Sequence, residues 1–399
     1  MTKLNKALMA STAIAFASGL AMPTVAQDPS AAPGVVSSQK KVKLRLYGQI
    51  SRQFGLVGDG EEVTFKQGAN GNTSTRMGID GRGKITKDIS LRTRLEYQVQ
   101  SGDTGGGTQF VNQGGSASRF TVRHLDVIIS SKKFGAVWIG RGDTASNGSS
   151  EIGLAKADSG RLGGSVASNV SEFIFLNDDE TPAGGTNTVG RYYSSFDGAG
   201  RQNRIRYDTP TLFGFKAGAS IIDKHNFEAA LRYSGKIAGT QVAGAVAYCH
   251  TQGASSAGQG ACFGNGTTIQ GIQQVNGSVS FKLPFGLGAT FAGARQWLDT
   301  PSGVNIDDPY NLQPSVFYTT KLTELGTTTF EYAYQFCKHC GGATDNEGQG
   351  HAVTVVQRID SVGGDYWAGF RYMDADRAAS AGPELDSLWF VGGGFRQRF

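Results

Sequence analysis

From Val42 onward, apolar and polar residues alternate in segments of about ten residues, and turn-rich stretches separate these segments. In the segment SLRTRLEYQV (90–99), one side of an extended chain is apolar, and the other carries the charged residues Arg92, Arg94 and Glu96. After the first residues of the chain, no segment repeats with a sustained helical period. The pattern predicts strands that have one oily face and one charged face.

Short and long connections alternate between these segments. We expect short turns at 85–88, 132–135, 210–214, 237–239, 284–286, 323–326 and 362–364. Longer loops rich in Gly, Asn and Ser are expected at 55–72, 102–118, 142–200, 250–270, 299–314, 338–350 and 376–384, with a brief connection at 224–226. The result is about sixteen strands with both ends on the short-turn side, which is typical of a transmembrane antiparallel β-barrel.

The last ten residues, FVGGGFRQRF (390–399), are interpreted as the strand that closes this barrel. Backbone groups in hydrocarbon need internal partners, so the last strand must pair with the first, around 43–54. Phe399 then lies at the lipid interface, and the wall aromatics are expected to face lipid with it, namely Tyr47, Trp138, Trp297, Trp367 and Trp389. A sixteen-strand cylinder is too wide for side chains to fill, so its interior should hold water.

Composition supports one repetitive object over two ordinary domains, because the chain of 399 residues has 58 Gly and only 18% charged residues. Mean hydropathy of −0.26 would by itself indicate a soluble protein. A secreted β-sandwich or adhesin is therefore the competing architecture. Each of its strands would bury one face in a core. Such a face would rarely carry three charged residues in succession, as Arg92, Arg94 and Glu96 are here.

The N-terminus has the pattern of a cleaved secretory signal, with Lys3 and Lys6 before an apolar run and small residues before Gln27. We expect a signal peptide over 1–26, a short mature segment over 27–41 and the barrel over 42–399. A retained anchor helix is the alternative, although the run is short. Cleavage removes two lysines and lowers the formal net charge from +5 to +3, which does not suggest nucleic-acid binding.

Export places the four cysteines in an oxidising compartment. Cys249 and Cys262 flank one loop-like stretch, and Cys337 and Cys340 form CKHC. Two loop disulfides are the natural interpretation, and a metal site that uses His250 and His339 is the alternative. No cofactor is expected, since the glycine runs lack the context of phosphate loops and CKHC lacks the histidine that haem attachment needs. No catalytic residue stands out, and an outer-membrane lipase is a weak alternative.

Four stretches resemble the general Gram-negative porins in the same order and spacing: LRLYGQISRQF, TRMGIDGRGKITKDISLRTRLEYQVQSGD, RHLDVIISSKKFGAVWIGRGDT and NRIRYDTPTLFGFKAGAS. The resemblance covers essentially the whole mature chain and is densest over 44–220. It implies a trimer of sixteen-stranded barrels in the outer membrane, each with its third long loop folded inward. Phe399 resembles the family's assembly signal, although Gln397 stands where relatives usually keep an apolar residue.

The family's constriction sets wall arginines against acids of the inward loop. Arg76 and Arg123 match its wall arginines, Glu96 matches its wall glutamate, and Gln49 lies where relatives often have a base. Alternation, and not the resemblance, adds Arg92 and Arg94 to the inward face. Together these residues predict a strongly basic wall.

The third loop, 143–200, carries eight acids against three bases. We select Glu151 and Asp158 for its tip because they come early after the strand, as in the family. Opposed charges act strongly across an opening narrower than the Debye length of about 8 Å.

These features predict a non-enzymatic, water-filled porin for passive diffusion of small hydrophilic solutes and ions, with a mild preference for anions. The expected partners are two further copies of the chain, outer-membrane lipid and lipopolysaccharide, and the barrel-assembly machinery, which would recognise the C-terminal strand. The alternative is a substrate-specific channel, in which Tyr192, Tyr193 and Phe196 form a track for a sugar or an aromatic solute.

Overall fold

The computed structural model describes residues 42–100, 109–110, 119–155, 166, 170–184, 187–223, 225–253, 262–263, 268–341, 343–378 and 381–399. The predicted signal peptide and the segment 27–41 lie outside these residues. Among the described residues, no helix is long and apolar enough to cross a membrane. Within the described ranges, the helical pieces are α2 (Val189–Tyr192) and the 3-10 turn η1 (Asp360–Val362).

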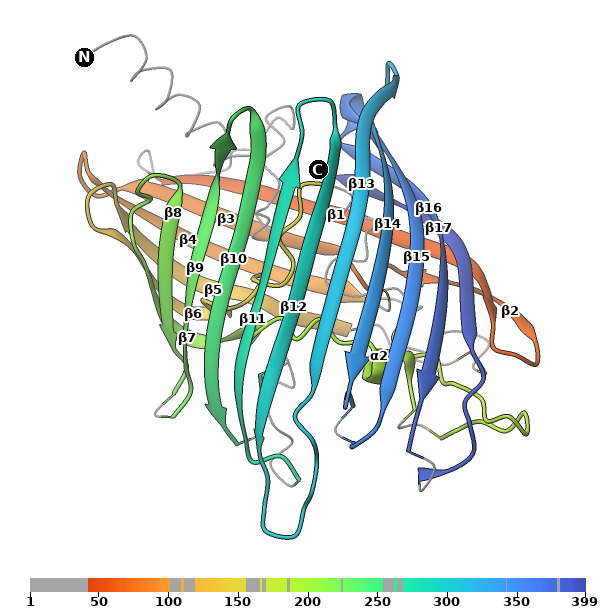
Figure 1. Cartoon of the computed structure of the whole chain (residues 1–399). Helices are drawn as coiled ribbons and strands as arrows, with labels where there is room; N and C mark the ends of the chain where they lie inside the picture. Colours follow the sequence, from red (N-terminus) through yellow and green to blue (C-terminus); the bar gives the residue numbers. More distant parts are fainter. Residues whose placement is uncertain are drawn as a thin grey trace.

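The rest of the regular structure is one antiparallel sheet (Figure 1). Its strands are β1 (Val42–Gly58), β2 (Val63–Ala69), β3 (Arg76–Lys84), β4 (Ile89–Gln100), β5 (Arg119–Ser131), β6 (Gly135–Asp143), β7 (Arg201–Asp208), β8 (Phe215–Ile221), β9 (Phe227–Ile237), β10 (Thr240–Gln252), β11 (Gly271–Lys282), β12 (Leu287–Asp299), β13 (Tyr310–Thr323), β14 (Gly326–Lys338), β15 (Glu347–Ile359), β16 (Gly364–Asp376) and β17 (Leu388–Arg398).

The sheet closes on itself, because β1 pairs with β17 along the register Gln49↔Arg398 to Gly58↔Trp389. On its other edge β1 pairs first with β3 and then with β2, so β2 and β3 are two parts of one interrupted wall strand. Seventeen strands therefore fill sixteen positions around the cylinder. The prediction of a closed barrel of about sixteen strands is confirmed, and with it the closing role of the C-terminal strand.

The connections follow the predicted alternation. Each predicted short turn falls between two consecutive strands of the structure, and Figure 1 shows these turns gathered at one end of the cylinder. The expected long loop at 55–72 is wrong, because β1 continues to Gly58 and β2 begins at Val63. The glycines and polar residues of that stretch favoured a loop. However, Val63 and Phe65 face outward while Lys66 is buried, which is the alternation of a strand.

The two faces of the wall differ as predicted. On β1, Ile50 and Phe54 are about half exposed, whereas the alternating residues Gln49, Ser51 and Gln53 are buried. The exposed apolar side chains recur at alternate positions around the cylinder and form an outer belt that suits lipid. The buried polar side chains point into the interior.

Phe399 belongs to the outer belt. Its backbone N–H and C=O both bond to the backbone of Gly48, at 3.1 and 3.0 Å, and the residue is 51% exposed. These bonds extend the seam between the last strand and the first by one more residue pair.

Only part of the predicted aromatic girdle faces outward. Trp297 is 41% exposed, and Trp389 shares the outward face of β17 with Val391. Tyr47, Trp138 and Trp367 are buried on the inner face, so the prediction is wrong for them. Each alternates with exposed, outward-facing neighbours on its own strand. Each also has a charged partner inside: the Tyr47 hydroxyl, for example, donates to Glu96 Oε2 at 3.0 Å.

Candidate pore constriction

The connection between β6 and β7, residues 144–200, is called the constriction loop below. Its first limb lies along the inner wall: the amides of Ile152 and Leu154 donate to the hydroxyls of Ser278 and Ser280 on β11, each at 3.0 Å. Further along, the amide of Val166 donates to Gln335 Oε1 on β14 at 2.9 Å. These bonds confirm that the loop folds inward.

Arginines of the wall hold the base of the constriction loop. Arg204 Nε donates to the carbonyl of Asp143 at 3.0 Å, and Arg206 Nη1 donates to the carbonyl of Thr144 at 2.8 Å. Arg232 Nη2 donates to the carbonyls of Ala145 and Asn147, at 2.6 and 3.0 Å. A guanidinium suits this role because its several N–H groups can satisfy more than one carbonyl. Sequence reasoning missed these three residues, although alternation along β7 and β9 places them on the inner face.

The middle of the loop is held by apolar packing. Phe173, Phe175 and Val189 are fully buried in one cluster with wall residues that include Ala333, Ala352, Val356 and Met373. Each fully buried large apolar side chain contributes about 1.5–3 kcal/mol. The inner face of β14–β16 is therefore partly apolar and covered by the loop, a departure from the predicted pattern of one oily face and one charged face.

The returning limb is fixed by side-chain amides. Gln335 Nε2 donates to the carbonyl of Ser194 at 3.0 Å, and Gln274 Nε2 donates to the carbonyl of Phe196 at 2.7 Å. Beyond its base, which the β7 arginines hold, the loop thus lies against β8–β16, and the inner faces of β3–β6 lie opposite it. Water-filled space must lie between these two sides.

Tyr192, Tyr193 and Phe196 are 0, 2 and 6% exposed. Burial raises the pKa of Tyr192 to about 12. Side chains packed this deeply cannot form a track for passing solutes, so that basis for a substrate-specific channel is wrong.

Both cysteine pairs form disulfides, Cys249 with Cys262 and Cys337 with Cys340. They support the returning limb: the amide of Cys262 donates to the carbonyl of Gly198 at 3.0 Å, and Phe196 packs against Cys337 and Cys340.

The alternative metal site does not form as expected. The ring of His250 on β10 lies 5.3 Å from that of Phe227. His339 instead lies with Asp307 and Asp345, and its Nδ1 accepts the amide N–H of Asp345 at 3.2 Å. The two histidines therefore have separate surroundings.

On the opposite wall, each predicted arginine has a carboxylate close by. Arg92 contacts Asp80 at 2.7 Å, and Arg94 contacts Asp126 at 2.9 Å. Arg123 Nε donates to Glu96 at 2.7 Å. The wall is therefore less strongly basic than predicted. Asp80 and Asp126 were not among the predicted constriction residues, although alternation along β3 and β5 places both on the inward face.

The arginines nevertheless outnumber these carboxylates. Asp80 is shared by Arg82 and Arg92, and Asp126 by Arg94 and Arg204. Glu96 contacts Arg123 and also interacts electrostatically with Arg76. Each of three acids thus serves two arginines, and the wall retains positive charge.

The predicted arginines differ in exposure. The side chains of Arg92 and Arg123 are 28 and 12% exposed, and that of Arg76 is partly exposed. Arg94 is only 5% exposed, and its guanidinium lies 5.5 Å from the centre of the Trp138 ring. The structure thus places Arg94 within the packing of the wall. Arg76, Arg92 and Arg123 stay the predicted lining residues.

Two acids of the loop region serve its architecture. Asp143 is buried and contacts Arg201 Nε at 2.9 Å. Asp197 accepts the amide N–H groups of Gly148 and Ser150, at 2.6 and 3.1 Å, and the hydroxyl of Ser150 at 2.9 Å. Its carboxylate joins the two limbs of the loop, and burial raises its pKa.

The other loop acids are spread out. Glu151, one of the two predicted tip acids, is partly exposed beside Gly148, and Asp158 lies outside the described residues. Asp178, Asp179 and Glu180 are exposed. They lie where the loop joins the β16–β17 connection, since the amide of Asp178 donates to the carbonyl of Glu384 at 3.1 Å.

A closed antiparallel cylinder, with an oily outside, a charged inside and a loop folded into the bore, is the architecture of an outer-membrane channel. The family model for Gram-negative porins matches residues 10–377, and the chain belongs to this family. It is a channel for passive diffusion, located in the outer membrane. No curated protein matches the chain.

Solved structures agree on the fold. The anion-selective porin from Comamonas acidovorans superposes with a TM-score of 0.59 at 15% identity, over 90% of this chain and 100% of that one. A loop-deletion mutant of OmpT, an outer membrane protein of Vibrio cholerae, gives 0.55 at 15% identity, over 90 and 100%. The outer membrane channel DcaP of Acinetobacter baumannii gives 0.54 at 13% identity, over 92 and 99%.

Proposed function

We propose that the protein is a general, non-enzymatic pore for small hydrophilic solutes and ions, with a mild preference for anions. The observation that carries the proposal is the sharing of Asp80, Asp126 and Glu96 among arginines of the wall. Asp143, at the end of β6 on the same wall, is engaged by Arg201, and Asp197 of the loop is engaged by loop amides. Charge left on the arginine side attracts anions across a gap that salt screens weakly.

The measurement is the reversal potential of the purified channel in a planar bilayer under a KCl gradient. A general pore with this wall gives a potential of the sign expected for modest chloride preference, and its current rises in proportion to salt. Cation preference would contradict the charge argument. A current that saturates, or that one sugar or aromatic solute blocks, would instead favour the substrate-specific channel.

The assembly is proposed to be a homotrimer, as the family match supports. Arg52 adds an observation from this chain: it lies on the outward face of β1 between Ile50 and Phe54, and its Nη2 donates to Gln67 Oε1 at 3.2 Å. A cation that faces lipid costs up to about 2–4 kcal/mol, whereas a neighbouring subunit would shield it.

Semi-native electrophoresis of Arg52→Glu tests this role of Arg52. The substitution should weaken the trimer relative to the wild type and to Lys43→Glu, a substitution at the barrel end. Equal trimer yield in all three would remove Arg52 from the interface.

Two further partners belong to the proposal. The outer belt would contact outer-membrane lipid and lipopolysaccharide, and the C-terminal strand would be read by the barrel-assembly machinery. Phe399 supports the second, since it is half exposed at the very end of the closing strand. Deletion of Phe399 should lower the amount of assembled protein in the membrane, as judged by heat-modifiable migration. Undiminished assembly would contradict this role.

A further inference from the structure

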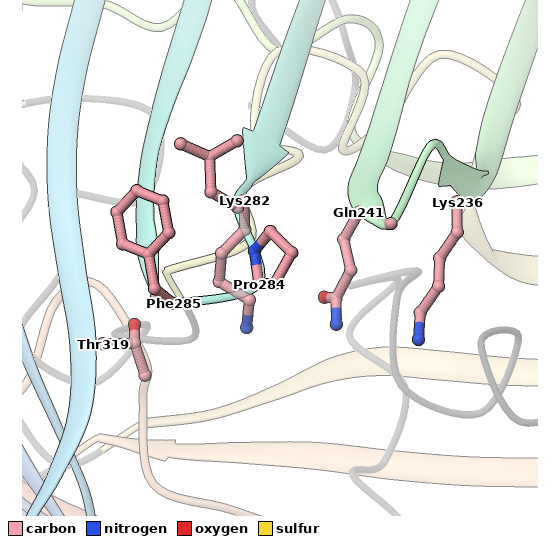
Figure 2. Close-up of a pocket in the computed structure, with 9 residues that line it drawn as sticks. Lys236, Gln241, Lys282, Pro284, Phe285 and Thr319 are labelled. Carbon is pink, nitrogen blue, oxygen red and sulfur yellow. The ribbon is translucent and has the colours of Figure 1, made fainter.

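A pocket lies at the short-turn end of the barrel, away from the constriction loop. It has a volume of about 380 Å³ and is lined by the ends of β9–β11, by the turn 283–286 and by Thr319 of β13 (Figure 2). In the porin family the short turns face the periplasm, so the pocket opens at the periplasmic mouth. Nothing in the mechanism of the constriction uses it.

Polar groups of the pocket come from three neighbouring strands. Lys236 pairs with Gln241, and Gln241 pairs with Lys282, so the three side chains form a row across β9, β10 and β11. Lys236 shares the inward face of β9 with Glu228 and Arg232. Figure 2 shows the ends of all three side chains extending in the same direction. The row therefore presents two ammonium groups and an amide toward the bore.

The other side of the pocket is apolar. Leu283, Pro284 and Phe285 of the β11–β12 turn line it, and Phe285 is 64% exposed. The described lining residues include no acid. The exposed aromatic residue offers contact area to a flat apolar body. Figure 2 shows the Phe285 ring extending away from the ends of the two lysines, so a ligand that contacts both must reach around the turn.

We propose that this pocket is a binding site for small organic carboxylates that have an apolar or aromatic body. The carboxylate would accept hydrogen bonds from Lys236, Lys282 and the Gln241 amide, while the body packs on Leu283, Pro284 and Phe285. The volume falls within the range of small-ligand sites. Lysine ammonium groups are strongly hydrated point charges, so by themselves they bind a small anion weakly. An anion with an apolar body gains additional contact with the apolar side of the pocket, and chloride and acetate lack such a body.

The site goes beyond the proposed function, because it lies at the mouth and not at the constriction. It would retain organic anions at the periplasmic end, where they leave or enter the bore. Binding does not require conduction, so equilibrium binding to detergent-solubilised protein tests the pocket even if the protein passes no current.

Fluorine NMR of 4-fluorobenzoate gives the binding curve for four proteins: wild type, Lys236→Gln/Lys282→Gln, Phe285→Ala and the control Lys84→Gln. Lys84 ends β3 at the same rim but does not line the pocket. Loss of two charged donors should weaken binding about tenfold or more. Phe285→Ala should weaken 4-fluorobenzoate but leave acetate, measured by competition, unchanged. Lys84→Gln should bind as the wild type does.

Three outcomes would overturn the site. If Lys84→Gln weakens binding of 4-fluorobenzoate as much as the double variant does, the general positive potential of the rim explains the binding and the pocket does not. Binding of neutral 4-fluorobenzamide as tightly as 4-fluorobenzoate would remove the lysines from recognition. Unchanged binding in both the double variant and Phe285→Ala would place the bound anion elsewhere.

Discussion

Arg232 is the residue whose loss should most directly loosen the constriction loop. It is buried on β9, and its Nη2 donates to the carbonyls of Ala145 and Asn147, at 2.6 and 3.0 Å. A hydrogen bond from a charged donor contributes about 1.5–3 kcal/mol. Water in the bore can replace part of what the carbonyls lose, so Arg232→Met should cost the anchored loop about 3 kcal/mol, near the lower end for two bonds.

A cost of about 3 kcal/mol raises the population of the released loop base about a hundredfold. Single-channel recording should therefore show greater open-channel noise and an altered conductance in Arg232→Met, at fixed salt and voltage. Removal of a charge from the bore could itself change the current, so Arg232→Lys is the matched control. Lysine keeps the charge but lacks the second arm of the guanidinium, and it should restore ion selectivity without restoring a quiet channel.

Quiet, wild-type recordings from Arg232→Met would refute the argument that this arginine holds the loop. A full return to wild-type behaviour in Arg232→Lys would refute it in another way, because charge alone would then explain the effect.

Three further outcomes follow from the same geometry. Arg76→Ala/Arg123→Ala should shift the reversal potential in a KCl gradient toward cation preference, and an unchanged potential would remove both residues from the constriction. Cys249→Ser/Cys262→Ser removes the link across a separation of 13 residues and should lower the free energy of unfolding by about 3 kcal/mol; calorimetry in detergent checks this, and an unchanged transition would contradict it. Burial raises the pKa of Asp197, so the anchored loop binds a proton more tightly than the released loop does. Anchoring of the loop should therefore strengthen as pH falls from neutral toward about 4 and weaken as pH rises through the raised pKa. Open-channel noise should therefore decrease on acidification, and Asp197→Asn, which cannot titrate, should lose that dependence; an equal decrease in both would assign the effect to other groups.

Alternation along single strands, together with the spacing of short and long connections, was enough to predict the fold and the inward position of the charged wall residues. Arg92, Arg94 and Glu96 lie on one face because β4 is extended, and that requires no knowledge of other strands. Their ion partners depend on register. Arg94 lies opposite Asp80 on one side and Asp126 on the other, and its side chain contacts Asp126. Pairing of this kind is fixed only once the sheet has closed.

The constriction loop shows why the site was harder to predict than the barrel. Ile152 bonds to Ser278 across 126 positions of sequence, and no periodic pattern links the two segments. A register shift after Glu96 on β4 likewise leaves Arg123 without a Cα partner on that strand while its side chain reaches Glu96. Neither the loop contacts nor the bulge could be read from hydrophobic alternation. The alternative in which Tyr192, Tyr193 and Phe196 contact passing solutes failed because the sequence pattern does not show that the loop buries them.

The account depends on a closed hydrogen-bonded cylinder that carries water past an inward loop. Conductance of the purified, refolded chain in a planar bilayer tests this most directly. We expect discrete current steps that increase linearly with KCl concentration, because ions move through bulk-like water in the bore. Absence of steps from correctly folded, membrane-inserted protein would contradict the account, and so would a conductance that does not respond to salt.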